Sequence, residues 1–190
     1  RLALCDKWDI AGSSEILVTV GRLDSQKDPI LLAQSFRLLL EKRPEAKLVF
    51  IGDGVLREDL IAYLNQYGIA DNAILTGLLS AAGISNILRA SDLFVLSSAY
   101  EGMPMCVLEA LGTGLPVVTT NVGEVKRVVL HNKNGEVVEN RTASAISEAV
   151  DRALNRLEEY SGLPCTDAVK QYTPECVLAP VYENYRKLAG

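Results

Sequence analysis

The fold is decided in one stretch of the chain, Leu93-Phe-Val-Leu-Ser-Ser-Ala-Tyr-Glu-Gly-Met-Pro-Met-Cys-Val-Leu-Glu109. Its apolar beginning predicts a buried strand, and the Gly-Met-Pro turn opens an apolar helix. Two carboxylates, Glu101 and Glu109, bracket the start of that helix. Backbone N–H groups at a helix start bind anions, and carboxylates accept hydrogen bonds from hydroxyls. The stretch therefore suits an anionic, hydroxyl-rich ligand such as a nucleoside diphosphate sugar, although acids near a helix start also have a purely structural explanation.

Apolar strands and helices alternate along the rest of the chain. The predicted strands lie at Ile16–Val20, Lys47–Ile51, 74–75, Leu93–Leu96, Val117–Thr120 and 135–137. Further helices are predicted from Asp28-Pro29 to Lys42-Arg43-Pro44 and over 56–66, 84–89, 143–157 and 175–188. Continuously apolar strands indicate a parallel sheet that is covered on both faces. The alternation predicts an α/β domain with a doubly wound parallel sheet of Rossmann-like type.

The composition indicates a single globular domain. The 190 residues are 48% hydrophobic, which is enough for a proper core, and the net charge of -5 disfavours a nucleic-acid-binding surface. No apolar run reaches membrane-spanning length, and the first residues do not resemble a signal peptide. Four scattered cysteines without metal-ligand spacing indicate a reduced, cytoplasmic protein. The first residue is Arg1 rather than Met, which indicates a piece of a longer chain.

Neither a catalytic histidine nor a metal site is expected. The only histidine, His131, lies in a polar loop, and we expect it at the surface. Asp24 and Asp28 could suggest a metal site, but Asp28 is placed to cap a helix. Cys106 lies within the two-carboxylate stretch, where a small buried thiol is interpreted as packing.

Glycine and polar residues follow the predicted strands repeatedly. The segments are Gly21-Arg22-Leu23, Gly52-Asp53-Gly54, Thr76-Gly77, Ser97-Ser98 and Asn121-Val122-Gly123-Glu124. Ligands of open α/β sheets bind beyond the carboxyl ends of the strands, so we expect these segments to border one crevice. Arg22 and Lys27 could bind phosphate oxygens there without a metal. Taken alone, Lys27 is better explained as a solvated loop charge.

Five segments, in this order, carry a resemblance to a known family. They are Gly21-Arg22-Leu23…Lys27, Gly52-Asp53-Gly54-Val-Leu-Arg, Asp92-Leu-Phe-Val-Leu-Ser-Ser, Glu101-Gly-Met-Pro…Glu109-Ala110 and Gly112-Thr-Gly-Leu-Pro-Val-Val118. Together they resemble the carboxyl-terminal, donor-binding domain of retaining glycosyltransferases with the GT-B fold, of the family 4 type (glycosyl transferases group 1). The resemblance implies one nucleotide-sugar-binding domain over residues 1–190, with its core at about 13–158 and closing helices to 190. The amino-terminal acceptor domain would be absent from this chain.

The resemblance implies a role for each matching position. Arg22 and Lys27 would bind the diphosphate and stabilise its charge as the sugar leaves, and Glu101 would contact hydroxyls of the donor sugar. Glu109 would hold the ribose hydroxyls, and the base would lie near 76–78. The other implied substrate-binding positions are Gly21, Gly54, Thr76, Gly77, Leu78, Gly102, Met103, Pro104, Met105, Cys106 and Val107. The implied donor is a UDP-sugar or a GDP-sugar, and neither a cofactor nor a metal is implied.

The resemblance also implies a reaction, which is metal-independent transfer of the sugar to an acceptor with retention of configuration. The acceptor, a saccharide or a lipid, would bind to the missing amino-terminal domain. Any contact with the inner face of the membrane would also be made by that domain. We therefore expect this chain alone to bind the donor and to transfer little sugar. Two positions depart from the family pattern: Asp28 stands where a glycine is frequent, and Val122-Gly123-Glu124 is a loose version of a glycine-glycine turn.

Other functions stay open from the sequence. A nucleotide-sugar epimerase would have the same architecture, and a non-catalytic nucleotide-binding or interaction domain would keep the fold. A dinucleotide-binding dehydrogenase has little support, because Arg57 occupies the third glycine position after Gly52-x-Gly54. Tyr182, Tyr185 and Leu188 on the last helix are expected to pack rather than to bind a ligand.

Overall fold

The computed structural model describes residues 1–8 and 10–189, without the side chains at 3, 4, 183 and 187–189. Its central element is a six-stranded sheet with the order β3-β2-β1-β4-β5-β6. The strands are β1 (Ile16–Val20), β2 (Lys47–Ile51), β3 (Ala73–Gly77), β4 (Leu93–Leu96), β5 (Val117–Thr120) and β6 (Gly135–Val138). Neighbouring strands all pair in parallel, so the carboxyl ends of the strands lie at one edge of the sheet. The predicted doubly wound parallel sheet is therefore confirmed.

The strand predictions succeed where a strand is buried on both faces. β1, β2, β4 and β5 have the predicted bounds, and their apolar residues are almost all inaccessible to solvent. β6 is one residue longer than the predicted 135–137, and β3 runs over five residues where only 74–75 was expected. As an edge strand it is only partly buried, so it needs fewer apolar residues and gives a weaker signal in the sequence.

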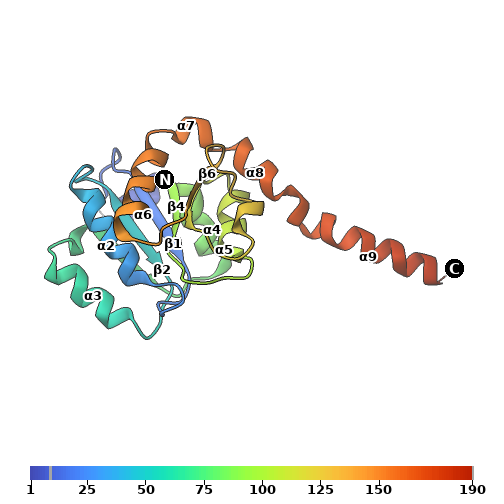
Figure 1. Ribbon diagram of the computed structural model, residues 1–190, viewed down its shortest axis with the longest axis horizontal. Coiled ribbons are helices and arrows are strands. Elements are labelled where there is room, and N and C mark those ends of the chain that lie inside the picture. Colours follow the sequence, from blue (N-terminus) through green and yellow to red (C-terminus); the bar gives the residue numbers. More distant parts are fainter. Residues whose placement is uncertain (9, 190) are drawn as a thin grey trace.

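Two layers of helices cover the sheet. One apolar core lies under α2 (Pro29–Leu40), α3 (Arg57–Gln66), α6 (Ala143–Leu154) and α7 (Leu157–Tyr160). The other lies under α1 (Leu2–Trp8), α4 (Ala81–Ala90), α5 (Met105–Gly112) and α8 (Leu163–Val169). Figure 1 shows α2, α3 and α6 on the side of the sheet away from α4 and α5. Side chains along β1 alternate between the two cores, because successive residues of a strand point to opposite faces.

Several helices differ from the predictions. The helix expected over 143–157 ends at Leu154, and α7 follows as a separate turn. Neither α1 nor α8 was predicted, because each is short and no side chain caps the start of α8. Three short 3₁₀ turns, Ala70–Asn72, Val125–Arg127 and Lys170–Tyr172, were not predicted either.

The last helix, α9 (Pro174–Ala189), extends away from the rest of the molecule (Figure 1). Tyr182 is 60% exposed and Tyr185 is 68% exposed. The prediction that these tyrosines pack is therefore wrong for this chain, and the side chain of Leu188 lies outside the described residues. Among the helices that the structure describes, none is long and apolar enough to cross a membrane.

Candidate functional site

The loop between β1 and α2 has a fixed shape that depends on Asp24. The Asp24 carboxylate accepts hydrogen bonds from the backbone N–H groups of Gln26 and Lys27, at 3.1 and 3.0 Å. Such a turn stabilises a tight loop without help from secondary structure. The carboxylate also lies 3.3 Å from the Arg22 guanidinium. Asp24 is therefore engaged in organising the loop that carries both predicted phosphate-binding cations.

Asp28 begins α2, as predicted, and it does so from an unusual backbone conformation. Its φ is 47°, in the left-handed region that favours glycine. Its carboxylate accepts a hydrogen bond from the N–H of Leu31 at 3.0 Å and pairs with the Arg141 guanidinium. The predicted cap is confirmed. The left-handed conformation also explains why glycine suits this position, while the two side-chain interactions of Asp28 compensate for the backbone strain.

The structure brings Lys27 and Glu101 into direct contact, although 74 residues separate them in the sequence. The Lys27 Nζ lies 2.6 Å from Oε1 of Glu101, and Ser98 donates its hydroxyl to the same oxygen at 2.8 Å. Gln26 Nε2 lies 3.4 Å from the other oxygen of Glu101. The Lys27 side chain is 20% exposed and that of Glu101 is 9% exposed, so the pair lies mostly out of solvent. The loops after β1 and β4 thus meet at the carboxyl edge of the sheet.

The start of α5 lies beside this ion pair. Pro104 is the residue before the helix rather than its first residue, and no side chain caps the helix start. The N–H of Val107 bonds to the carbonyl of Pro104 at 3.0 Å, whereas those of Met105 and Cys106 have no acceptor among the described residues. The Cys106 sulfur lies 3.9 Å from Lys27 Nζ, which places the ammonium at the helix start. A cation and two unpaired N–H groups therefore lie close together.

Cys106 itself is buried, as predicted. Burial raises the pKa of its thiol to about 11, although the nearby Lys27 ammonium acts in the opposite direction. The thiol is therefore neutral at physiological pH, and a neutral buried thiol packs rather than reacts. Because the side chain of Cys106 is small, the Lys27 ammonium can lie close to the start of α5.

Two glycines near the site are required by close backbone contacts. A Cβ on Gly123 would lie 1.8 Å from the carbonyl oxygen of Gly102, and the N–H of Glu124 donates to that carbonyl at 2.9 Å. A Cβ on Gly54 would lie 2.5 Å from the carbonyl oxygen of Leu23. Of the segment Val122-Gly123-Glu124, the position next to Gly102 therefore has to be glycine, because a side chain there would collide with the loop that carries Glu101. Gly54 is explained by the packing of two loops against each other.

Arg22 lies at the margin of this arrangement. Its side chain is 75% exposed, and its guanidinium donates to the side-chain oxygen of Gln26 at 3.3 Å. Gln26 therefore connects Arg22 to Glu101 through its two side-chain atoms. Sequence reasoning missed Gln26 and the contact between Ser98 and Glu101. The available signals were that Ser98 lies in a segment expected to border the crevice and that Gln26 precedes Lys27 in the sequence.

The Glu109 side chain lies in a different place from Glu101. It lines a cleft of about 300 Å³ between α4 and α5, together with Ile84, Ser85 and Thr113. The nearby loop after β3 offers little side-chain chemistry, since the Thr76 hydroxyl already bonds to the carbonyls of Phe50 and Gly77. Leu78 in the same loop is 81% exposed. The two predicted glutamates are therefore not brought together: Glu101 contacts Lys27, whereas Glu109 lines the cleft between α4 and α5.

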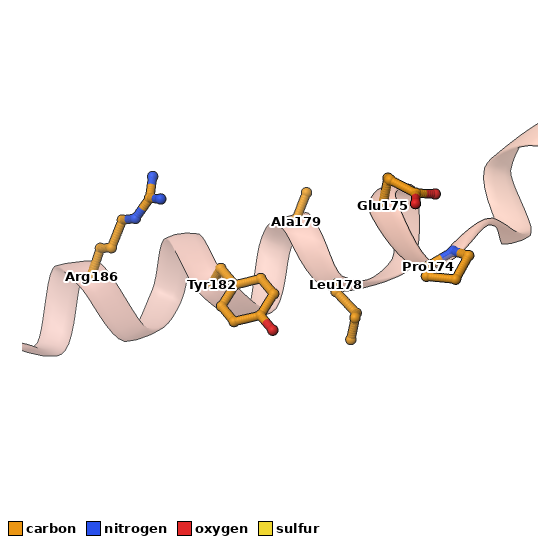
Figure 2. Close-up of a pocket in the computed structure, with 6 residues that line it drawn as sticks. All are labelled: Pro174, Glu175, Leu178, Ala179, Tyr182 and Arg186. Atoms are coloured by element: carbon orange, nitrogen blue, oxygen red, sulfur yellow. The ribbon is translucent and has the colours of Figure 1, made fainter.

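Neither the hollow along α9 nor the surroundings of His131 form a binding site within the described residues. Figure 2 shows the hollow along α9, whose lining residues all come from that one helix and point to more than one side of it. They do not converge on a common point, as the groups of a binding site would. In the part of the chain that the structure describes, no group of three or more His, Cys, Asp or Glu residues could hold a metal ion. The exposed His131 agrees with its predicted surface position.

Comparisons with known proteins identify the family of this chain. The chain matches the sequence profile described as "Glycosyl transferases group 1" over residues 3–162. It is 34% identical over 146 residues to the UDP-Gal:alpha-D-GlcNAc-diphosphoundecaprenol alpha-1,3-galactosyltransferase of Escherichia coli. That match covers 75% of this chain and 37% of the Escherichia coli protein. The chain thus spans little more than a third of the length of this curated relative.

Solved structures share the fold. The pneumococcal O-GlcNAc transferase solved with UDP and GlcNAc superposes with a TM-score of 0.83 at 18% identity, over 95% of this chain and 37% of that one. The carboxyl-terminal domain of a glycosyl transferase group 1 family protein from Francisella tularensis gives a TM-score of 0.79 at 22% identity. That superposition covers 92% of this chain and 93% of the domain. The α/β fold is therefore that of one domain of such proteins.

Proposed function

The chain belongs to the glycosyl transferases group 1 family, and from this premise we propose that it forms the donor-binding part of a sugar-transferring enzyme. The donor would be a nucleoside diphosphate sugar, bound at the carboxyl edge of the sheet. One observation carries the proposal: Lys27 Nζ lies 2.6 Å from Glu101 and 3.9 Å from Cys106, at the start of α5. A cation, a carboxylate and unpaired N–H groups thus stand together where the ligands of open α/β sheets bind.

The diphosphate would bind between Lys27 and the start of α5. Lys27 has three N–H donors and only one carboxylate contact, so it can donate to phosphate oxygens while it stays paired with Glu101. The N–H groups of Met105 and Cys106 add two donors. The exposed guanidinium of Arg22 can turn toward the same phosphates, because its contacts with Asp24 and Gln26 are both long.

The same groups would promote departure of the sugar. As the bond between sugar and phosphate breaks, negative charge collects on the leaving diphosphate. Fixed donors that are aimed at developing charge stabilise a transition state more than the ground state. We propose that Lys27, Arg22 and the start of α5 meet this charge without a metal. Retention of configuration is part of the same proposal, and it rests on the family resemblance of the site segments.

Glu101 and Glu109 would hold the two hydroxyl-bearing parts of the donor. Oε1 of Glu101 accepts from Lys27 and Ser98, whereas Oε2 has only a contact of 3.4 Å with Gln26. Oε2 can therefore accept a hydrogen bond from a sugar hydroxyl. We propose that Glu109, which lines the cleft between α4 and α5, accepts hydrogen bonds from the ribose hydroxyls. The base would contact the backbone of 77–78, because the Thr76 hydroxyl is engaged elsewhere.

Calorimetric titration of the chain with UDP, GDP and NAD tests the proposal. We expect UDP or GDP to bind and NAD not to bind. The solved pneumococcal relative contains UDP, which supports UDP as the first nucleotide to test. Binding of NAD without either diphosphate would instead favour a dinucleotide-binding domain and would overturn the assignment.

The acceptor would be bound outside this chain. Because the chain spans 37% of its Escherichia coli relative, we propose that a further part of the protein holds a saccharide or lipid acceptor and makes any contact with an inner membrane face. The chain alone should then bind the donor but transfer little sugar. Robust transfer by the chain alone would contradict this division of labour. Release of epimerised nucleotide sugar in the same assay would indicate an epimerase.

A further inference from the structure

A second cleft, of about 540 Å³, lies between α1 and α4. Both helices cover the same face of the sheet as α5. The cleft uses none of the residues assigned above to the diphosphate or to the sugar. Its polar and aromatic lining residues are Arg1, Lys7, Trp8, Asn86 and Arg89.

The charge of this cleft is opposite to that of the whole chain. The chain has a net charge of -5, yet the cleft lining contains three cations and no acid. Arg1 is neutralised, since its guanidinium lies 2.6 Å from the Asp92 carboxylate. Lys7 and Arg89 form no ion pair with any described residue, and Arg89 donates only a contact of 3.4 Å to Ser85. Two cations therefore keep their capacity to bind an anion.

An apolar surface lies next to these cations. Trp8 is partly buried and packs on the core beneath α4, and Ile87 is 7% exposed. The Lys7 ammonium lies 5.4 Å from the centroid of the Trp8 ring, within the range of a cation–π contact. An aromatic plate and an ammonium group are thus adjacent in one cleft. Asn86 adds an amide that can donate a hydrogen bond.

We propose that this cleft binds a phosphate ester whose organic part is apolar. The Arg89 guanidinium and the Lys7 ammonium take the phosphate oxygens, as a planar fork and a point charge respectively. The organic part lies against Trp8 and Ile87. A soluble phosphate ester and the headgroup of an acidic phospholipid share this chemistry, and the experiment distinguishes between them. The inference does not depend on the proposed donor site.

Trp8 provides a direct test, because it is the only tryptophan in the chain. Its fluorescence reports on this cleft, because Trp8 is one of the lining residues. The chain is titrated with hexyl phosphate, with inorganic phosphate, and with phosphatidylcholine vesicles that contain or lack phosphatidic acid. We expect saturable fluorescence changes with hexyl phosphate if the ligand is a soluble ester. A change only with phosphatidic acid vesicles would identify a lipid headgroup.

A charge variant and its matched control make the test specific. The double variant Lys7→Gln/Arg89→Gln should bind the responding probe at least about tenfold more weakly, because each cation makes a charge-assisted hydrogen bond. The control, Lys133→Gln/Lys170→Gln, removes the same charge from exposed positions elsewhere and should bind normally. Arg22→Ala/Lys27→Ala should also respond normally, since it alters only the donor site.

Three results would overturn the proposal. The first is the absence of any Trp8 response to hexyl phosphate and to phosphatidic acid vesicles. The second is an unchanged affinity in the Lys7→Gln/Arg89→Gln variant. The third is equal affinity for inorganic phosphate and hexyl phosphate, which would deny a role to the apolar wall.

Discussion

Two ion-pair clusters of similar composition lie in different parts of this molecule. The donor cluster, at the carboxyl edge of the sheet, consists of Lys27, Glu101, Ser98 and Gln26. The Arg43 cluster consists of Arg43, Glu15, Asp151 and Asn155, and it connects the end of α2 to α6. Both clusters are mostly shielded from solvent and join segments that are far apart in the sequence.

The clusters differ in how far their cations are satisfied. Arg43 donates to Asp151 at 2.7 Å, to Asn155 at 2.6 Å and also to Glu15, so each of its nitrogens has a protein acceptor. Lys27 has one close carboxylate and a thiol at 3.9 Å, beside two unpaired N–H groups. We propose that this remaining hydrogen-bond capacity makes the donor cluster a binding site, whereas the fully paired Arg43 cluster is structural. The comparison predicts that Arg43 serves stability and that Lys27 serves donor binding.

The largest expected effect is on donor binding. Replacing both cations in Arg22→Ala/Lys27→Ala should lower the affinity for UDP by about a hundredfold or more, because two charge-assisted contacts of about 1.5–3 kcal/mol each are lost. The free energy of unfolding should fall by about 1–2 kcal/mol, because the mostly buried Glu101 carboxylate loses its cation but keeps its contacts with Ser98 and Gln26. Calorimetric titration and urea unfolding measure the two quantities. A large loss of stability with normal affinity would reverse the assignment of this cluster.

In the Arg43 cluster, loss of the cation should lower stability without lowering the affinity for the donor. Arg43→Met leaves Glu15 and Asp151 without their guanidinium partner, so the free energy of unfolding should fall by about 2 kcal/mol. The affinity for UDP should stay within about twofold of that of the unaltered chain, which corresponds to about 0.4 kcal/mol. The same two measurements serve here, with Lys133→Met as the control for loss of a surface cation. Weakened UDP binding in a folded Arg43→Met protein would break the comparison.

The pH dependence of stability should sharpen the distinction. Burial alone would raise the pKa of Asp151, but hydrogen bonds from Arg43 and Lys42 outweigh it and hold that pKa below its usual value. The resulting stabilisation is present above the unfolded-state pKa of about 3.9 and is lost as the pH falls through the lower folded-state pKa.

Urea unfolding between pH 6 and pH 2 should therefore show a steeper loss of stability in the unaltered chain than in Asp151→Asn. Arg43→Met should have an intermediate slope, because Lys42 still contacts the carboxylate. Parallel curves for the three proteins would show that Asp151 does not contribute to the acid sensitivity.

The smallest effect is expected at Asp28, which adjoins the donor cluster. Asp28→Gly loses the helix cap and the Arg141 pair but relieves the positive φ, so stability should change by about 1 kcal/mol or less. Asp28→Ala loses the same contacts without relief and should cost about 1–2 kcal/mol. Thermal unfolding of the two variants checks the order. Equal stability would mean that the backbone conformation carries little strain.

Much of the fold could be predicted from the sequence, for reasons that particular elements show. The runs that form β1, β2, β4 and β5 are continuously apolar because both faces of each strand are buried. The alternation of strands and helices then fixes which strand ends share an edge. Edge strand β3 and the short helices α1 and α8 lack such signals. The exposed tyrosines of α9 show that an apolar pattern does not reveal whether a packing partner is present.

The candidate site could be predicted only in part. The topological rule brings Lys27 and Glu101 to one edge, and the structure places them in contact. The roles of Ser98 and Gln26 depend on side-chain rotamers, which the sequence does not specify. The Arg43 cluster depends on the packing of α2 against α6. Its residues Arg43 and Asp151 are 108 positions apart in the sequence, so no local pattern predicts their contact.

The central claim is that the carboxyl edge of the sheet holds a nucleoside diphosphate, and a crystal structure of the chain with UDP tests it most directly. We expect phosphate oxygens within hydrogen-bond distance of Lys27 Nζ and of the N–H groups at the start of α5. The ribose hydroxyls should lie at the Glu109 carboxylate. UDP bound elsewhere, with the Lys27–Glu101 pair untouched and Glu109 in solvent, would contradict the account.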